Sequence, residues 1–261
     1  MNRERLQKIR NWQSHEFYAA LVIRPLTIAV MMVVADWRWL TPNRVTIAAT
    51  IAKFGACGFI YRATGYDFIY AAGLLQLGLL LDHLDGTIAR YRNAGSSFGG
   101  YLDKIGDAIS WAAICLVIGW VAYRNSGDAY LLILAALATY GLLFSGYAKW
   151  LWAYEDQRLR WRDAEGDPAA AVERENKRSK PAPPPQRSLK QWIRWALSRL
   201  FAIVRFEEVD LFFWIGLFLV LKRLDLLLWG LALTQAALAL SAVVYRGIML
   251  IRIDAQRRRA E

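Results

Sequence analysis

Residues 82–107 read DHLDGTIARYRNAGSSFGGYLDKIGD and place four carboxylates in an otherwise apolar part of the chain. Asp82 and Asp85 are three positions apart and Asp103 and Asp107 are four apart, so on helices each pair shares one face. Carboxylates at the edge of a membrane segment are costly unless something neutralises them, which makes such a cluster a functional site by default. Two facing carboxylate pairs form an all-oxygen site, which suits hard divalent ions such as Mg²⁺ or Mn²⁺.

The composition favours a polytopic membrane protein over a soluble nucleic-acid-binding protein. The chain is 56% hydrophobic and has 12 Trp, yet its formal net charge is +11. Cys57 and Cys115 fall in expected membrane helices and form no CxxC motif, so we expect neither a disulfide framework nor a zinc site. The N-terminus is polar and shows no small-residue cleavage site after a short apolar core, so we expect no cleaved signal peptide.

The expected fold class is an all-α integral membrane protein with six transmembrane helices and with interfacial helices in the N-terminus and the cytoplasmic loop. The two halves of the acidic stretch end the second span and begin the third, and they face each other across a turn at 91–97. Thr41-Pro42-Asn43 is typical of a helix start, because a proline in the first turn lacks only an N–H that would be unpaired anyway. The expected spans are 43–63, 67–91, 97–123, 128–152, 208–222 and 225–251.

Two further segments are apolar but interrupted or amphipathic. Arg24-Pro25 breaks residues 17–36 early, so we expect a helix that lies at the interface or leans on the bundle, with a true span as the alternative. Residues 188–205 indicate either an interfacial amphipathic helix on anionic lipid or a helix packed on the bundle from the soluble side. The chain then divides into a cytoplasmic N-terminus with its interfacial helix (1–40), a transmembrane catalytic half (41–152), a charged Pro-rich cytoplasmic loop (153–187), an amphipathic helix (188–207), two final spans (208–253) and a basic tail (254–261).

The distribution of Lys and Arg predicts the orientation. In a six-span arrangement the N-terminus, the 91–97 turn, the 153–207 loop and the basic tail lie on one side and hold most of the positive charge, so this side should be cytoplasmic. The acidic stretch opens to the same side. We therefore expect a multi-pass protein, in a bacterial inner membrane, with its active site facing the cytoplasm.

The acidic stretch resembles the signature of the CDP-alcohol phosphotransferase (CDP-alcohol phosphatidyltransferase) family: Asp-x-x-Asp-Gly-x-x-Ala-Arg, eight residues, then Gly-x-x-x-Asp-x-x-x-Asp. The resemblance implies a membrane enzyme of phospholipid synthesis. Such an enzyme transfers a phosphatidyl or other phospho-alcohol group from a CDP-linked donor, foremost CDP-diacylglycerol, to an acceptor hydroxyl and releases CMP. The resemblance also implies a homodimer that uses Mg²⁺ or Mn²⁺. Because the donor's pyrophosphate must be held while its phosphorus is attacked, we expect two ions.

The resemblance assigns roles to the residues of the stretch. Asp107 is the expected general base toward the acceptor hydroxyl, and small residues allow the nucleotide to approach the helix backbone. Asn43, Thr46 and Lys104 are candidate phosphate or acceptor contacts, although helix capping explains Asn43 and Thr46 equally well. The expected metal ligands are Asp82, Asp85, Asp103 and Asp107, and the expected nucleotide-binding residues are Asp82, Gly86, Ala89, Arg90 and Gly99.

The acceptor alcohol is less well defined by the sequence. Several relatives that use phosphorylated acceptors have Lys or Arg directly after the last motif aspartate, whereas this chain has Ala108, which favours an uncharged or zwitterionic acceptor. Arg24, Lys149 and Arg205 would be the alternative source of a phosphate pocket.

Two rival functions remain. A cation-coupled transporter would have aspartates near the bilayer midplane and paired discontinuous helices. An inactive relative acting as a scaffold gains no support, because all eight motif positions are intact.

Overall fold

The computed structural model describes Ile9, residues 18–166, Gln191 and residues 208–258. Within these residues every regular element is a helix. The N-terminal part has a short π-helix, η1 (Ala19–Ile23), followed by α2 (Arg24–Val34). The remaining helices are α3 (Pro42–Arg62), α4 (Asp67–Arg92), α5 (Ser97–Ser126), α6 (Tyr130–Gly166), α9 (Glu208–Val220) and α10 (Leu224–Arg258).

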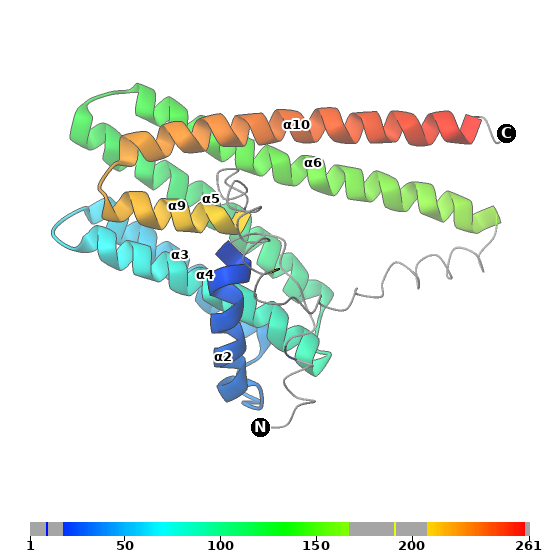
Figure 1. Ribbon diagram of the computed structural model, residues 1–261, viewed down its shortest axis with the longest axis horizontal. Coiled ribbons are helices and arrows are strands. Elements are labelled where there is room, and N and C mark those ends of the chain that lie inside the picture. The colour runs from blue at the N-terminus through cyan, green and yellow to red at the C-terminus, as the bar shows by residue number, and fades with distance from the viewer. Residues whose placement is uncertain (1–8, 10–17, 167–190, 192–207, 259–261) are drawn as a thin grey trace.

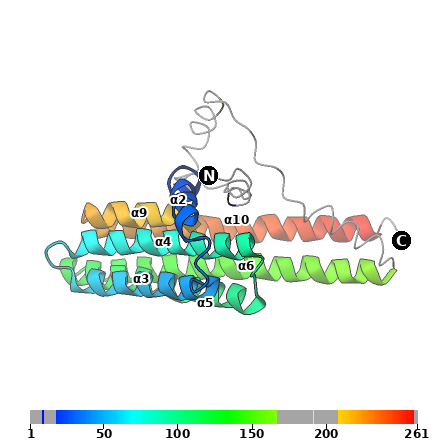
Figure 2. The same cartoon turned by 90° about the horizontal axis from the view of Figure 1, so that it is seen from below.

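The helices α3, α4, α5, α6, α9 and α10 lie side by side along one direction, and α2 runs across them (Figures 1 and 2). Among the described residues, four helices are long and apolar enough to cross a membrane: α4, α5, α6 and α10. Helix α9 has only 13 residues, and the apolar run of α3 is interrupted by Lys53. The chain is therefore a nearly all-helical, multi-pass membrane protein, and the expected number of six spans is not confirmed.

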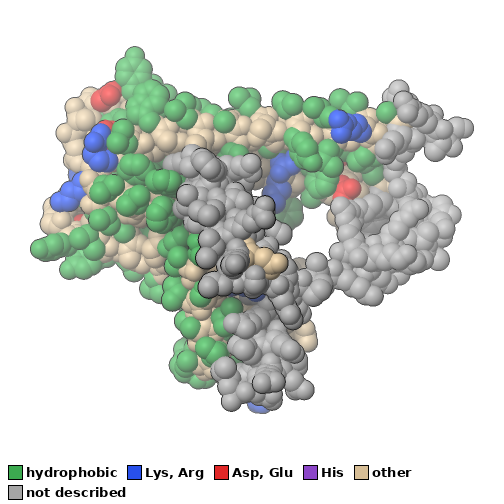
Figure 3. All heavy atoms as spheres, in the orientation of Figure 1, with side chains coloured by type: hydrophobic (Ala, Val, Ile, Leu, Met, Phe, Trp, Pro, Cys, Tyr) green, Lys and Arg blue, Asp and Glu red, His purple; other side chains and the backbone are tan. Residues whose placement is uncertain are grey.

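The outer surface of the bundle is strongly apolar. Side chains such as Ile51, Ile133, Leu233 and Leu240 are more than 60% exposed. In Figure 3, hydrophobic side chains cover much of the visible described surface, and charged side chains gather at the end of the bundle on the left. Exposed apolar area of this kind is expected where helices contact lipid.

The helix ends around the acidic stretch agree with the sequence. Thr41 caps α3 by accepting a hydrogen bond from the Arg44 N–H at 3.4 Å. Asn93 ends α4 in the left-handed region with φ 50°, and the Ser96 hydroxyl caps α5 by accepting from the Gly99 N–H at 3.0 Å. The expected helix start and the short turn between the two motif halves are both confirmed.

The segment before α3 is fastened to the bundle at two places. The Tyr18 N–H donates to Asp210 on α9 at 2.9 Å, and the Tyr18 hydroxyl donates to Gln76 on α4 at 2.7 Å. At the other end, the Arg92 guanidinium donates to the carbonyls of Ala35 and Leu40 at 2.8 Å each. Because α2 crosses the bundle direction (Figure 1), its placement supports the interfacial interpretation of residues 17–36 over a span.

Two expected boundaries fell short of the helix ends. The fourth helix does not end at residue 152, since α6 continues to Gly166. Charged residues there are compatible with a helix because they pair along it, as Glu155 does with Arg158 at 3.7 Å. Helix α10 likewise continues to Arg258, into the expected basic tail. The rest of the Pro-rich loop and, apart from Gln191, the expected helix at 188–207 lie outside the described residues.

Candidate active site

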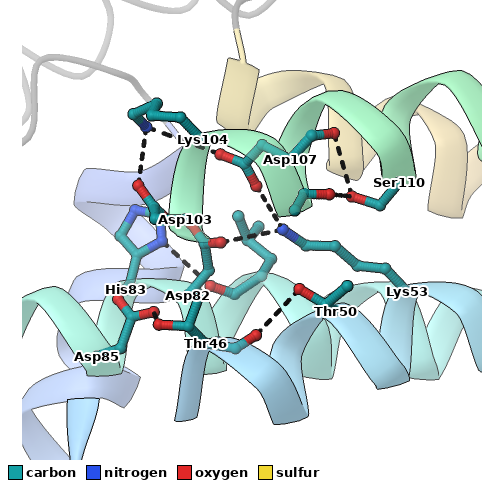
Figure 4. A network of polar contacts seen from close by, with 12 residues as sticks. Thr46, Thr50, Lys53, Asp82, His83, Asp85, Asp103, Lys104, Asp107 and Ser110 are labelled. Atoms are coloured by element: carbon teal, nitrogen blue, oxygen red, sulfur yellow. Dashed lines mark hydrogen bonds and ion pairs between the residues drawn. The ribbon is translucent and has the colours of Figure 1, made fainter. Parts of the chain in front are cut away.

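Three of the four motif aspartates come together between α4 and α5. Asp82, Asp103 and Asp107 each offer a carboxylate oxygen, and these atoms lie within 4.8 Å of one another (Figure 4). An octahedral Mg²⁺ or Mn²⁺ with oxygen ligands at about 2.1 Å holds those ligands roughly 3–4 Å apart. The three carboxylates therefore fit a hard divalent cation with only a small adjustment.

Asp85 lies apart from this group, against α3. Its side chain accepts a hydrogen bond of 2.5 Å from the Thr46 hydroxyl, and both residues are buried, at 7% and 5% exposed. A hydroxyl-to-carboxylate bond of this length is charge-assisted and among the stronger protein hydrogen bonds. Thr46, expected as a phosphate contact or a cap, is thus a partner of Asp85.

A buried lysine that the sequence interpretation missed completes the cluster. Lys53, in the middle of α3, is 2% exposed. Its ammonium donates to Asp82 Oδ1 at 3.0 Å and to Asp107 Oδ1 at 2.8 Å, and Figure 4 shows its side chain reaching toward these two carboxylates. The signal was present in the sequence, because a lysine inside an expected membrane helix is itself costly and needs a named partner.

The methylene groups of Lys53 pack closely against Gly78 of α4. A Cβ added to Gly78 would lie 3.0 Å from Lys53 Cγ, so glycine at this position leaves room for the lysine methylenes. On another side, the ammonium lies 5.5 Å from the centre of the Phe212 ring of α9, within cation–π range. The Lys53 side chain is therefore held by contacts with α4, α5 and α9.

Lys104 contacts the same cluster from the solvent side. Its ammonium lies 3.0 Å from Asp103 Oδ2 and 3.8 Å from Asp107 Oδ2, and its side chain is 51% exposed. The expected contact with phosphate is untested, but Lys104 is close enough to Asp103 and Asp107 to share a ligand with them.

The expected nucleotide-binding residues lie on the same two helices. A Cβ on Gly86 would come within 3.2 Å of the Arg90 guanidinium, so that side chain folds back over Gly86. A Cβ on Gly99 would lie 2.8 Å from Asn43 Oδ1, which brings the start of α3 against the start of α5. Ala89 is half-buried one turn before the end of α4. Their roles in nucleotide binding remain predictions.

A cavity of about 640 Å³ opens beside the carboxylates. Asp107, Lys104 and Trp111 of α5 line it together with Lys149 of α6 and Arg246 of α10. Lys149 had been expected as a possible phosphate contact; Arg24 does not line the cavity, and Arg205 lies outside the described residues. The cavity thus joins the candidate base to a cationic lining from three helices.

These features define a multi-pass helical membrane protein with a carboxylate site for a cation next to a basic cavity. The family model for CDP-alcohol phosphatidyltransferase matches residues 39–160, the segment that holds α3, α4, α5 and most of α6. The resemblance seen in residues 82–107 is confirmed.

Curated relatives share the same segment. A CDP-diacylglycerol–serine O-phosphatidyltransferase of Helicobacter pylori is 31% identical over 107 residues, which are 40% of this chain and 44% of that protein. A phosphatidylinositol phosphate synthase of Mycobacterium bovis is 36% identical over 86 residues, which are 33% of this chain and 39% of that protein. The chain thus spans less than half the length of these two relatives.

Among solved structures, the chain is similar to a Mycobacterium tuberculosis phosphatidylinositol phosphate synthase with CDP-DAG bound. The two are 20% identical, with a TM-score of 0.48 over 85% of this chain and 90% of that one.

Proposed function

We propose that this protein is a divalent-metal-dependent CDP-alcohol phosphotransferase that makes a phospholipid. The observation that carries the proposal is the convergence of Asp82, Asp103 and Asp107 from two helices beside a basic cavity. CDP-diacylglycerol is the proposed donor, since relatives of the family segment include a CDP-diacylglycerol–serine O-phosphatidyltransferase.

In the proposed reaction the acceptor hydroxyl oxygen attacks the donor phosphorus that carries the lipid. A new P–O bond forms, the P–O bond to CMP breaks, and the hydroxyl proton leaves the acceptor oxygen. A bound divalent ion would neutralise the phosphate oxygens and stabilise the departing CMP. Asp107 lines the cavity, so it can orient the hydroxyl and accept its proton.

The lining of the cavity supports an acceptor that carries negative charge. Lys104, Lys149 and Arg246 contribute cations, against the single carboxylate of Asp107. Guanidinium and ammonium groups bind phosphate through charge-assisted hydrogen bonds. We therefore propose a phosphorylated acceptor, in place of the uncharged or zwitterionic acceptor that Ala108 favoured.

The site is proposed to face the cytoplasm of a bacterial inner membrane. The start of α3 and the turn between α4 and α5 lie at the end of the bundle where Arg44, Arg90 and Arg92 gather, in accord with the positive-inside rule. The homodimer remains a prediction.

The test is CMP release by the purified full chain with CDP-diacylglycerol and Mg²⁺. Acceptors to screen are glycerol phosphate, inositol phosphate, serine and inositol. We expect release with a phosphorylated acceptor, and a loss of about 100-fold or more in Asp107→Asn, typical of a removed general base. CMP release with serine alone would refute the anionic acceptor, and no release with any acceptor or CDP-linked donor would refute the proposed function.

The transport alternative gains little from the helices. Among the described residues, α4 and α5 run unbroken through the motif aspartates, whereas transport sites of this kind use paired discontinuous helices. Ion flux in vesicles without CMP production would nevertheless favour a transporter, and a folded protein with neither activity would favour a scaffold.

A further inference from the structure

Lys53 lies outside the acidic stretch, yet it is the buried cation that contacts the carboxylate cluster. Its ammonium bridges Asp82 of α4 and Asp107 of α5, at 3.0 Å and 2.8 Å. Bridging two carboxylates that come from different helices is also what a metal ion does in a two-metal site, where the ions lie roughly 3.5–4 Å apart.

The lysine is built into this position. It starts from the middle of α3, is 2% exposed, and its stem passes Gly78 at a distance that excludes a methyl group there without displacement. A buried ammonium that left the two carboxylates would lose its partners and remain out of water, which is strongly unfavourable. The charge therefore stays in the site when ligands bind.

The net charge of the residues around Lys53 is balanced by one divalent ion. Asp82, Asp103 and Asp107 contribute three negative charges and Lys53 contributes one positive charge, so a single divalent ion balances the group. Lys104 contributes less, because it is 51% exposed and its charge is screened by water. Asp85 is not one of the three grouped carboxylates and accepts its hydrogen bond from Thr46.

We propose that Lys53 is a fixed cation of the active site that takes the place of one of two divalent ions. This inference rests on the proposed function. It means that the protein binds a single Mg²⁺ or Mn²⁺, and that one ion and the Lys53 ammonium replace the two expected ions. Lys53 then positions Asp107 through Oδ1 and leaves Oδ2 as the oxygen nearer to Lys104.

The experiment counts Mn²⁺ bound to the full chain in lipid nanodiscs by electron paramagnetic resonance. We expect about one ion per wild-type chain, with a mononuclear spectrum. Lys53→Met keeps the length of the stem and removes the charge, so we expect about two ions in that variant, with the spin coupling of a close pair. Lys222→Met is the control, because it removes an exposed lysine from the turn between α9 and α10, away from the cluster, and it should bind one ion as the wild type does.

Each outcome is decisive. Two coupled ions in the wild type would overturn the role of Lys53, and this result stands even if Lys53→Met fails to fold. One ion in both the wild type and Lys53→Met would overturn it as well. If the wild type releases CMP while it holds two ions, only this inference fails. If it binds no Mn²⁺ and releases no CMP, the proposed function fails with it.

Discussion

Replacing Thr46 with valine tests whether the Thr46 hydroxyl holds Asp85. Valine has nearly the shape of threonine but no hydroxyl, so the change removes the 2.5 Å hydrogen bond and leaves the packing of α3 on α4 largely intact. Asp85 is 7% exposed, so water cannot readily replace the lost donor.

The expected cost follows from the burial and charge of the acceptor. A hydrogen bond to a charged group contributes about 1.5–3 kcal/mol, and a buried acceptor left without its donor bears the full desolvation penalty. We therefore expect Thr46→Val to destabilise the protein by about 2 kcal/mol. For a chain of this size that corresponds to a fall of roughly 4–8 °C in Tm.

The chain carries its own probe for this measurement. Cys57 and Cys115 are its two cysteines, and both are buried thiols. A thiol-reactive fluorophore will label them only as the helices separate, so a thermal ramp in detergent reports unfolding without introduced cysteines.

Thr46→Ser is the matched control. Serine keeps the hydroxyl and loses one methyl group, so it should lie much closer to the wild type than valine does. An unchanged Tm in Thr46→Val, or an equal loss in Thr46→Ser, would show that the hydrogen bond to Asp85 contributes nothing measurable.

Three further outcomes are expected. Gly78→Ala should lower the stability by about 1–3 kcal/mol and also lower CMP release, because the new Cβ would lie 3.0 Å from Lys53 Cγ. Gly73→Ala is the control on the same helix. Its Cβ would have nothing within 4 Å, so the variant should be neutral or slightly stabilising in the thiol assay. Lys149→Met should raise the KM for a phosphorylated acceptor roughly 10-fold, as the loss of a charged hydrogen bond predicts, and should leave the KM for the donor unchanged. Lys222→Met removes an exposed lysine at the far end of the bundle and should change neither KM. Chelation with EDTA should abolish CMP release, and added Mg²⁺ or Mn²⁺ should restore it; activity that persists after chelation would contradict the metal role.

Local signals in the sequence were sufficient for the helix boundaries around the site. Thr41-Pro42 and Ser96 mark helix starts because their side chains cap free N–H groups, and Asn93 ends α4 because asparagine tolerates the left-handed conformation. The end of α6 was misplaced because charged residues were taken to end the helix at residue 152. Charge ends an apolar span but does not end a helix whose acidic and basic residues pair along it.

Distances between helices were not accessible in the same way. Spacing along the chain indicated that Asp82 and Asp85 share a helix face. The two carboxylates nevertheless have different neighbours on α3: Lys53 donates to Asp82, and Thr46 donates to Asp85. Which residue of α3 meets which aspartate depends on the axial register of α3 against α4, and Gly78 helps to set that register by letting Lys53 cross it. No short motif contains this information.

The acceptor shows the same limit of local reasoning. Ala108 indicates correctly that no cation follows Asp107 along the chain, but the cations that face Asp107 across the cavity come from α6 and α10, 42 and 139 residues later, at Lys149 and Arg246. A phosphate is recognised by the summed charge of the surface that encloses it, whichever helices supply that charge. For this reason the cations of the cavity lining are a better guide to the acceptor than Ala108 is, and a phosphorylated acceptor is the first substrate to assay.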